Sequence, residues 1–586
     1  MSLISELKRR NVFRVALLYA VACWLILQVT DVGMSLLGLP EWTGRFVFFL
    51  LLLGFPLVVL FSWAYEITPE GLKKESDVPR DESITAETAR KLNTAVVVLL
   101  VLAIGGLIVD RLIPEQGMPA ESTVAVDGTE APATEKSIAV LPFVNMSSDA
   151  ENEYFSDGLS EELLNLLARI PELQVAARTS AFSFKGVDAD ITEIGDKLNV
   201  AHVLEGSVRK SGDQIRITAQ LIKASDGYHL WSETWDRTLV DIFAIQDEIA
   251  AAVVDALKVE LLGEVPHARV TDPRAYELYL QSRAASNLFT REGLEQAAGL
   301  LTQALAIDPD YAEAWSALGV IQTNLTGQGH ISPEVGFARA RSSAERALKL
   351  DPENVRAITG LGWISMYYDW DFQAAARYIG EARRIEPGNA SVLNTTAVLN
   401  GVFGRRDAMI SYYEEALTKD PMSMSILGNL AGAYLNTEPQ RTRVLVERMH
   451  KLEPDSINVP VFSAWAEQFD GNAEIAIEQF LQMDDVNGAW GRALTYWDLG
   501  MDAESDAAIQ ELIEMQTQPT RIAVAYAHRD DHDNAFRWLE TGFEERDDWL
   551  IEIRLYKAMD NLVDDPRWDA LLSRLGLRDE DATGVL

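Results

Sequence analysis

Cysteine and histidine are scarce in this 586-residue chain, which contains one cysteine and seven histidines. The single Cys23 lies in an apolar run, so no intrachain disulfide can form and a disulfide-stapled fold is excluded. Residues 144–154, the loop expected after a strand at 137–143, contain no glycine. This excludes a glycine-rich phosphate loop there. We therefore expect no cofactor and no catalytic site.

Basic residues are also outnumbered, with 51 Lys and Arg against 89 Asp and Glu and a net charge of −38. The segment 1–113 holds eleven of each sign, so the whole acidic excess lies in the rest of the chain. Phosphate binding depends on clustered Lys and Arg, so this balance disfavours a nucleic-acid partner. A hydrophobic content of 48% excludes a mainly disordered chain, and the length allows several domains.

Three apolar runs stand out in the segment 1–113. Residues 92–109 contain no charge, and neither do residues 15–30 and 46–65. A bilayer core is spanned by roughly 20 mostly apolar residues. We therefore expect three transmembrane helices, at about 15–33, 46–65 and 92–113, and contact with a lipid bilayer. A buried core helix at 92–109 is the alternative, which the two upstream runs disfavour.

The basic residues flanking these runs predict an orientation. Four lie before the first run, one between the first and second, five between the second and third, and one directly after the third. Under the positive-inside rule, this pattern predicts a protein of the bacterial inner membrane with its N-terminus in the cytoplasm and its C-terminal body in the periplasm. A cytoplasmic location of the body is the alternative. A lipoprotein cleavage site at Cys23 is disfavoured because the apolar run continues beyond it.

Residues 114–136, rich in Pro, Glu, Ala and Thr, predict a flexible linker. Residues 137–258 then predict a compact α/β domain. Its expected strands are 137–143, 173–177, 203–209, 214–222 and 229–235, and its expected helices 159–170, 190–198 and 242–257. The last three strands are separated by short turns containing glycine, which indicates an antiparallel meander.

From residue 272 to residue 586 the chain repeats one helical theme. Prolines recur at positions 309, 352, 387, 421 and 454, so that successive steps are 43, 35, 34 and 33. A period of 34 with small residues at fixed positions is the tetratricopeptide (TPR) pattern of paired helices. We expect about eight pairs, a longer loop near residues 327–338, and a terminal cap over 547–577.

Several strings resemble a known bacterial family. SELKRRNVFRVALLYAVACWLILQV near the start, SIAVLPF, YFSDGLSEELLNLLARI, VLEGSVRKSGDQIRITAQLI and DGYHLWSETWDR resemble membrane proteins with a TolB-like amino-terminal domain and TPR repeats. Relatives in that family often carry an adenylate cyclase or winged-helix domain ahead of the membrane. Only about ten residues precede the first apolar run here, so we expect neither output domain in this chain.

The expected fold is thus multidomain and mainly α, with three transmembrane helices, a small TolB-like α/β domain and an all-α TPR solenoid. Such arrays bind partners on their concave face. By resemblance to other TPR proteins, the exposed protein-binding positions would include Ser316, Asn324 and Asn394. His528 and His532 have the i, i+4 spacing of a metal site, but no third ligand is evident, so we expect no metal.

We expect a non-enzymatic scaffold or sensor that binds a protein or peptide partner through the TPR and TolB-like surfaces. The alternative from another class is a subunit of a signalling or hydrolytic enzyme system. Composition and motifs indicate no particular oligomeric state.

Overall fold

The computed structural model describes residues 134–578, except 171, 188, 258–266 and 268, together with short stretches and single positions before residue 75. Two units are separated near residue 123. In the first, β1 (Tyr65–Thr68) pairs antiparallel with β2 (Gly71–Lys74). The expected linker lies mostly outside the described residues.

The prediction of three transmembrane helices is wrong by this structure. Among the described residues, no helix combines the length and the apolarity that crossing a membrane requires. The expected run 46–65 ends in strand rather than helix, because Tyr65 pairs with Lys74 in the β1–β2 hairpin. Most residues of the three runs lie outside the described part of the chain. The inner-membrane location and the periplasmic placement of the body rested on those helices and are withdrawn with them.

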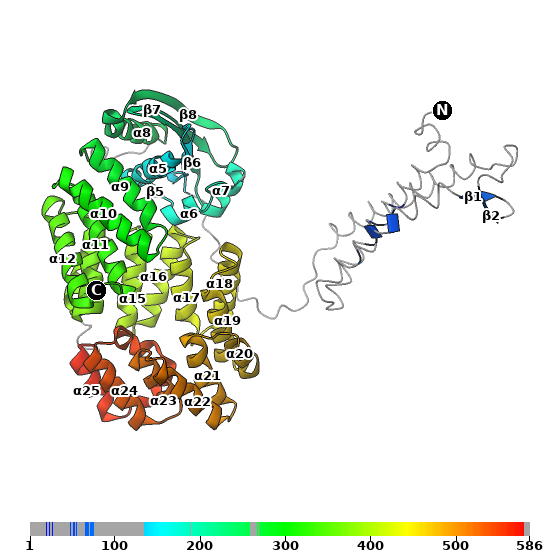
Figure 1. The fold of residues 1–586 in the computed structure, drawn as a ribbon, viewed down its shortest axis with the longest axis vertical. Helices are drawn as coiled ribbons and strands as arrows, with labels where there is room; N and C mark the ends of the chain where they lie inside the picture. Colours follow the sequence, from blue (N-terminus) through cyan, green and yellow to red (C-terminus); the bar gives the residue numbers. More distant parts are fainter. Residues whose placement is uncertain are drawn as a thin grey trace. The chain divides into compact units, whose positions relative to one another are not determined.

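The second unit begins with the expected α/β fold (Figure 1). Its elements are β3 (Ser137–Val140), β4 (Val144–Asn145), η2 (Ala150–Asn152), α5 (Glu153–Ala168), β5 (Gln174–Val175), α6 (Arg178–Phe182), α7 (Ile191–Leu198), β6 (His202–Ser211), β7 (Gln214–Lys223), β8 (His229–Thr238), η3 (Leu239–Asp241) and α8 (Ile242–Ala256). The sheet order is β5-β3-β6-β7-β8, with β4 also on β6. The antiparallel meander β6-β7-β8 is confirmed.

The rest of the unit is a helical array. Its helices are α9 (Pro273–Ser286), α10 (Arg291–Ile307), α11 (Ala312–Gly327), α12 (Pro333–Leu350), α13 (Val355–Trp363), α14 (Phe372–Ile385), α15 (Ala390–Val402), α16 (Arg406–Lys419), α17 (Met424–Tyr434), α18 (Pro439–Leu452), α19 (Asn458–Phe469), α20 (Ala473–Phe480), α21 (Val486–Asp498), α22 (Asp502–Glu514), α23 (Pro519–His528), α24 (His532–Glu545) and α25 (Pro566–Leu575). A π-helix, η4 (Ile364–Asp369), continues α13, and two 3-10 helices, η5 (Asp548–Leu555) and η6 (Lys557–Leu562), follow α24.

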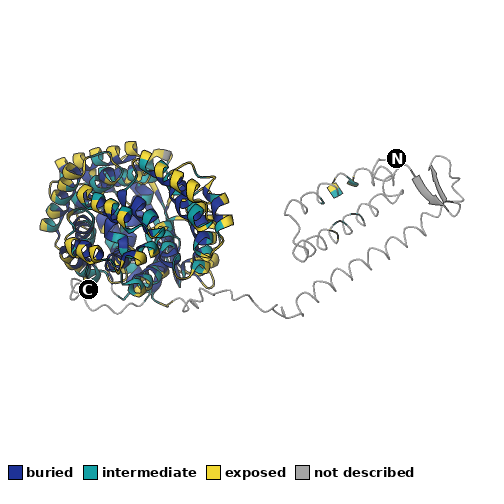
Figure 2. Cartoon of the chain, turned by 90° about the horizontal axis from the view of Figure 1, so that it is seen from below, coloured by how far each residue is buried: buried dark blue, intermediate teal, exposed yellow. Residues whose placement is uncertain are grey.

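Consecutive helices from α9 to α24 pack as eight TPR-like pairs, as the repeat predicts. Small side chains permit this packing, since Ala340, Ala344 and Ala347 of α12 are buried at the contact with neighbouring helices. The longer loop expected near 327–338 is mostly helical instead. Ser332 precedes α12 as its N-cap residue and Pro333 occupies its first turn, where proline needs no backbone donor. Buried residues line the inside of the array and exposed ones its outer side (Figure 2).

The α/β domain and the first helical pairs share one hydrophobic core. Residues of α5 such as Leu159 and Leu163 belong to the same cluster as Tyr276 and Tyr279 of α9. At this junction Glu161, only 3% exposed, forms ion pairs with Arg283 of α9 and with Arg178 of α6. The domain therefore packs on the array through buried apolar and charged contacts rather than through a loose surface.

A second junction joins the same domain to the middle of the array. Asp420, which follows α16, accepts hydrogen bonds from the backbone nitrogen (3.1 Å) and the hydroxyl (2.5 Å) of Ser180 in α6. The hydroxyl of Ser180 in turn accepts from the backbone nitrogen of Met422 at 2.9 Å. Ser180 and Asp420 are both buried, and this junction joins residues that lie 240 positions apart in the sequence.

Candidate functional site

A cavity of about 920 Å³ lies in the second half of the array. Its walls come from α13, η4, α15, α16, α17, α19, α21 and α23, with η5 and η6 along another side. Pockets of several hundred Å³ with apolar walls and a few polar groups are the usual form of ligand sites. This cavity exceeds two other pockets of the described residues, of about 410 and 30 Å³, and is the candidate functional site.

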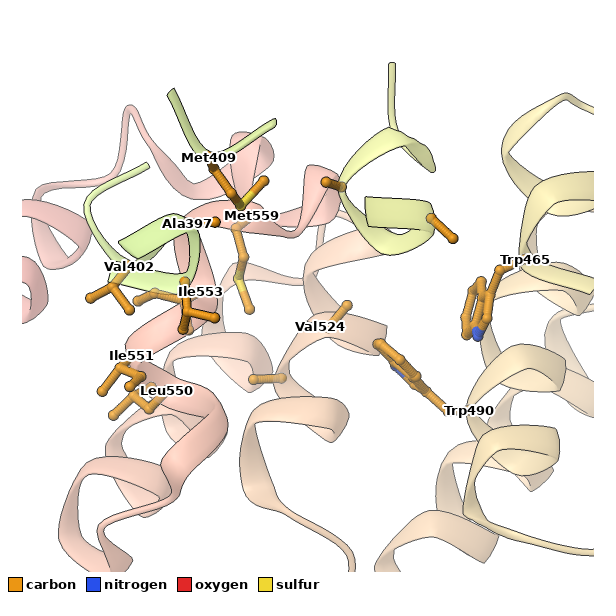
Figure 3. Packing of buried hydrophobic residues seen from close by; sticks show 14 of the residues in the cluster. Ala397, Val402, Met409, Trp465, Trp490, Val524, Leu550, Ile551, Ile553 and Met559 are labelled. Carbon is orange, nitrogen blue, oxygen red and sulfur yellow. The ribbon is translucent and has the colours of Figure 1, made fainter. Parts of the chain in front are cut away.

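The segment η5–η6 completes the cavity because it folds back against helices far earlier in the sequence. Arg406 and Asn436 both donate to the carbonyl oxygen of Leu555, at 2.9 and 3.0 Å. The buried side chains of Ile553 and Met559 pack near Val402 and Met409 of α15 and α16 (Figure 3). The terminal segment is thus more than the cap that the sequence predicts, since it forms a wall of the site.

Four aromatic residues of the lining contact one another and, together with Arg521, form what we call the aromatic recess: Trp465, Trp490, Arg521, Trp549 and Tyr556. The rings of Trp465 and Trp490 meet edge to face with centres 4.8 Å apart. Figure 3 shows the two rings side by side, each on its own helix. Trp549 and Tyr556 stack with an interplanar angle of 5°. These rings supply a large apolar surface of fixed orientation.

The guanidinium of Arg521 lies within this aromatic group. Its central carbon is 4.0 Å from the ring centre of Trp549 and 5.4 Å from that of Trp490. One terminal nitrogen donates to the side-chain oxygen of Asn487 at 3.3 Å. Burial lowers the pKa of Arg521 from its ordinary value, because the charged form is poorly solvated there. The cation is held by ring faces rather than by a carboxylate.

Several buried polar atoms of the lining have no hydrogen-bond partner among the described residues: Nε1 of Trp490, Oε1 of Gln468, Oδ1 of Asn436 and Nε of Arg521. Leaving such an atom unpaired costs about 1–3 kcal/mol. Three of these four residues are less than a tenth exposed: Gln468, Trp490 and Arg521. Unpaired donors and acceptors around one cavity are what a binding site offers to a ligand.

A carboxylate lies on another wall. Glu552 accepts a hydrogen bond from the hydroxyl of Tyr367 at 2.8 Å. Burial raises the pKa of Glu552 and raises that of Tyr367 well above its usual value, since both charged forms are disfavoured. Asp498, also in the lining, is engaged by His528 (2.8 Å) and Gln468. This arrangement can bind polar groups, but the described lining places no serine or cysteine nucleophile beside a base.

The two histidines considered for a metal do not share a helix. His528 ends α23 and His532 begins α24, and each contacts a carboxylate on its own side: Asp498 for His528, and Asp530 with Asp565 for His532. No group of three or more metal-binding side chains is present in the part of the chain that the structure describes.

The predicted protein-binding residues lie apart from one another. Ser316 is buried at 2% exposure and donates to the backbone oxygen of Glu313, so the expectation that it is exposed is wrong. Asn324 is partly buried near the end of α11. Asn394 accepts from Asn429, which lines the cavity, at 3.0 Å. Their role in binding remains a prediction, and Asn394 is hydrogen-bonded to a residue of the lining.

Sequence reasoning missed the aromatic recess. Its members are scattered between positions 465 and 556 and fall in repeats that lack the proline marker. The available signal was the tryptophan in the first helix of two successive degenerate repeats, Trp465 in α19 and Trp490 in α21.

Comparison with known proteins gives similarities to parts of this chain. Residues 134–252 match the family model for the second domain of HilA/YgeH-like transcriptional regulators. A putative adenylate cyclase 3 of Rhizobium meliloti is 40% identical over 220 residues, which is 37% of this chain and 38% of that protein. The transcriptional regulator HilA of Salmonella paratyphi A is 23% identical over 317 residues, 52% of this chain and 55% of the regulator.

This chain therefore spans about two fifths to about half of the length of these curated relatives. A solved tetratricopeptide repeat protein from Parabacteroides merdae is similar over 43% of this chain and 98% of its own, with a TM-score of 0.32 and 17% identity. The similarity of the α/β domain is thus to HilA-like regulators. The expected TolB-like domain has no support in these comparisons, and neither do the expected lipid partner and the exclusion of nucleic acid.

Proposed function

We propose that this chain is a non-catalytic interaction module that holds a segment of a protein partner at the mouth of the array cavity. The observation that carries the proposal is the cavity itself, enclosed between the inner helices of the array and η5–η6. Extended inner surfaces of repeat arrays bind protein segments without a catalytic cleft. The similarity of residues 134–252 to a domain of transcriptional regulators supports a regulatory rather than an enzymatic module.

The mouth of the cavity has the chemistry of a protein contact. Asn458 and Lys557 of the lining are exposed, and Phe462 and Val461 beside them are partly buried. The adjacent Ile457 is 80% exposed, an unusual position for a large apolar side chain. An apolar centre with amide and charged groups at its edge is the usual composition of a partner-binding surface.

The array and the α/β domain would act together in this role. The two junctions described above, at Glu161 and at Asp420, hold the domain on helices α9 and α16–α17. A partner bound at the array would therefore be presented in a fixed position relative to the regulator-like domain. The fixed position follows from burial of both contacts.

Photocrosslinking in cells tests the proposal. The full chain would carry p-benzoyl-phenylalanine at Phe462, in the cavity lining, or at Ile475 of α20, which is 49% exposed and outside the lining. We expect a defined protein adduct from position 462 and none from position 475. Equal adducts from both positions, or no adduct from position 462, would reject the cavity mouth as the partner site.

A further inference from the structure

The aromatic recess contains a buried cation without a buried anion. Arg521 is 7% exposed, and it forms no ion pair with any carboxylate of the described residues. Asp485, Asp547 and Asp548 act on its charge without forming an ion pair with it, and the first two are hydrogen-bonded to backbone groups. Asp485 accepts from the backbone nitrogens of Asn487 and Gly488, at 3.0 Å each. Asp547 accepts from the backbone nitrogens of Thr520 (2.8 Å) and Trp549 (3.0 Å).

These carboxylates cap helix and loop ends, so they stabilise backbone groups and leave the guanidinium edge unpaired. A buried charge without a partner is costly to the fold. A buried charge that lines a cavity and has a shifted pKa is a candidate functional group.

The geometry of Arg521 specifies how a ligand would approach. The rings of Trp549 and Trp490, which are nearly perpendicular at 83°, both pack against the guanidinium. Its nitrogens remain the groups that can donate hydrogen bonds. One edge nitrogen contacts Asn487 at 3.3 Å, and Nε has no partner. A guanidinium edge matches the two oxygens of a carboxylate. The unpaired Nε1 of Trp490 supplies a further donor in the recess.

The same ring group disfavours other ligands. An aromatic recess alone could hold an organic cation, but Arg521 already occupies that role and would repel a second positive charge. Trp465, Trp490 and Arg521 are each less than a tenth exposed, which leaves access for a compact molecule more readily than for a main chain that must enter and leave.

We propose that the aromatic recess binds a small free organic acid, with its carboxylate on the edge of Arg521 and an aromatic or branched apolar body against Trp465 and Trp490. The occupant is a ligand distinct from the protein partner proposed above, and the two proposals stand on different parts of the cavity. Binding would tie α21, α23 and η5 together, since Trp490, Arg521 and Trp549 come from these three elements.

Calorimetry and thermal unfolding of the full chain test this with phenylacetate as the probe. Phenylacetamide has the same body without the charge, and phenethylamine has the opposite charge. We expect phenylacetate to bind and to raise the unfolding midpoint. The amide should bind roughly tenfold or more weakly, and the amine not at all. Equal affinity for the acid and the amide would overturn the proposal, as would no binding of phenylacetate, indole-3-acetate or cyclohexanecarboxylate.

Two arginine variants localise the effect. R521Q should weaken phenylacetate binding roughly tenfold or more. R529Q is the matched control, because Arg529 also stacks on a tryptophan, at 5.0 Å from the ring of Trp497, but is paired with Asp506 and lies outside the lining. It should leave binding unchanged. If R521Q unfolds, W465L takes its place, with weaker phenylacetate binding expected. Unchanged binding in a folded R521Q or W465L variant would refute the assignment.

A peptide arm identifies the source of the carboxylate. An acetylated tetrapeptide ending in phenylalanine would be compared with a free and with an amidated C-terminus. Weak or absent binding of both, beside clear binding of phenylacetate, supports a free acid. Binding of the free-terminus peptide without binding of any free acid would overturn the proposed occupant. Failure of photocrosslinking at Phe462 with intact phenylacetate binding would reject the partner proposal alone.

Discussion

Removing the carboxylate of Asp420 should release the α/β domain from the middle of the array. Asp420 is 5% exposed and is the acceptor for both the backbone nitrogen and the hydroxyl of Ser180. In D420A these two buried donors lose their partner. One unsatisfied buried donor costs about 1–3 kcal/mol, and the hydroxyl can rotate toward another acceptor, so we expect a loss of about 2 kcal/mol at this junction.

A local measurement suits this change better than global unfolding, because a chain of several packed parts need not unfold in one step. Native-state hydrogen exchange reports the opening of α6 directly. A loss of about 2 kcal/mol corresponds to roughly thirtyfold faster exchange at Ser180 and Met422, with little change in α21–α24. D420N keeps an acceptor oxygen and removes the ionisable carboxyl group, whose pKa is raised by burial. This variant should therefore lose less than about 1 kcal/mol of stability at the junction.

The matched control is E453A. Glu453 holds the same position before the proline of the next repeat, but it is exposed. Its removal should leave exchange unchanged throughout the array. Equal exchange in D420A and E453A would refute the reasoning, because the Asp420–Ser180 contact would then contribute nothing. A loss of protection over the whole unit would also refute it, since the junction would then not be local.

Two further predictions concern pH and close packing. Burial raises the pKa of Glu552, so the folded chain keeps the carboxyl proton at a pH where the unfolded chain has lost it, and stability falls as pH rises above about 4.5. In E552Q, which still accepts from Tyr367, the denaturation midpoint should depend less on pH. An identical pH profile would contradict this. A Cβ at Gly336 would overlap the hydroxyl of Thr326, whereas one at Gly299 meets nothing within 4 Å. By thermal denaturation, G336A should therefore lose about 1–3 kcal/mol and G299A should gain up to about 1 kcal/mol, and the reverse order would contradict the packing described.

The sequence predicted those parts of the fold that depend on local patterns. The period of 34 with buried Ala340, Ala344 and Ala347 implied paired helices, and they are present. The turns containing Gly212 and Gly227, both at positive φ, implied the meander, and it is present. Each of these features is determined by residues that lie close together in the sequence.

The site itself depends on distant contacts, which local patterns do not encode. The bond from Arg406 to Leu555 joins residues 149 positions apart, and the bond from Tyr367 to Glu552 joins residues 185 apart. Apolarity alone was also misleading for the segment 1–113, because a run of uncharged residues at 46–65 does not show where a strand begins. Tyr65 starts such a strand.

The most direct test of the central claim, that the cavity is the binding site, is to fill it. Gly432 of α17 lines the cavity, and a Cβ there would meet only the ring of Phe462, at 3.7 Å, so the first atom of the leucine in G432L fits and the rest adds apolar atoms to the lining. Gly360 of α13 is the control, since it is also helical, lies outside the lining and has nothing within 4 Å. The account predicts that G432L abolishes the protein adduct formed at position 462 while G360L retains it. A full adduct in a folded G432L variant would contradict it.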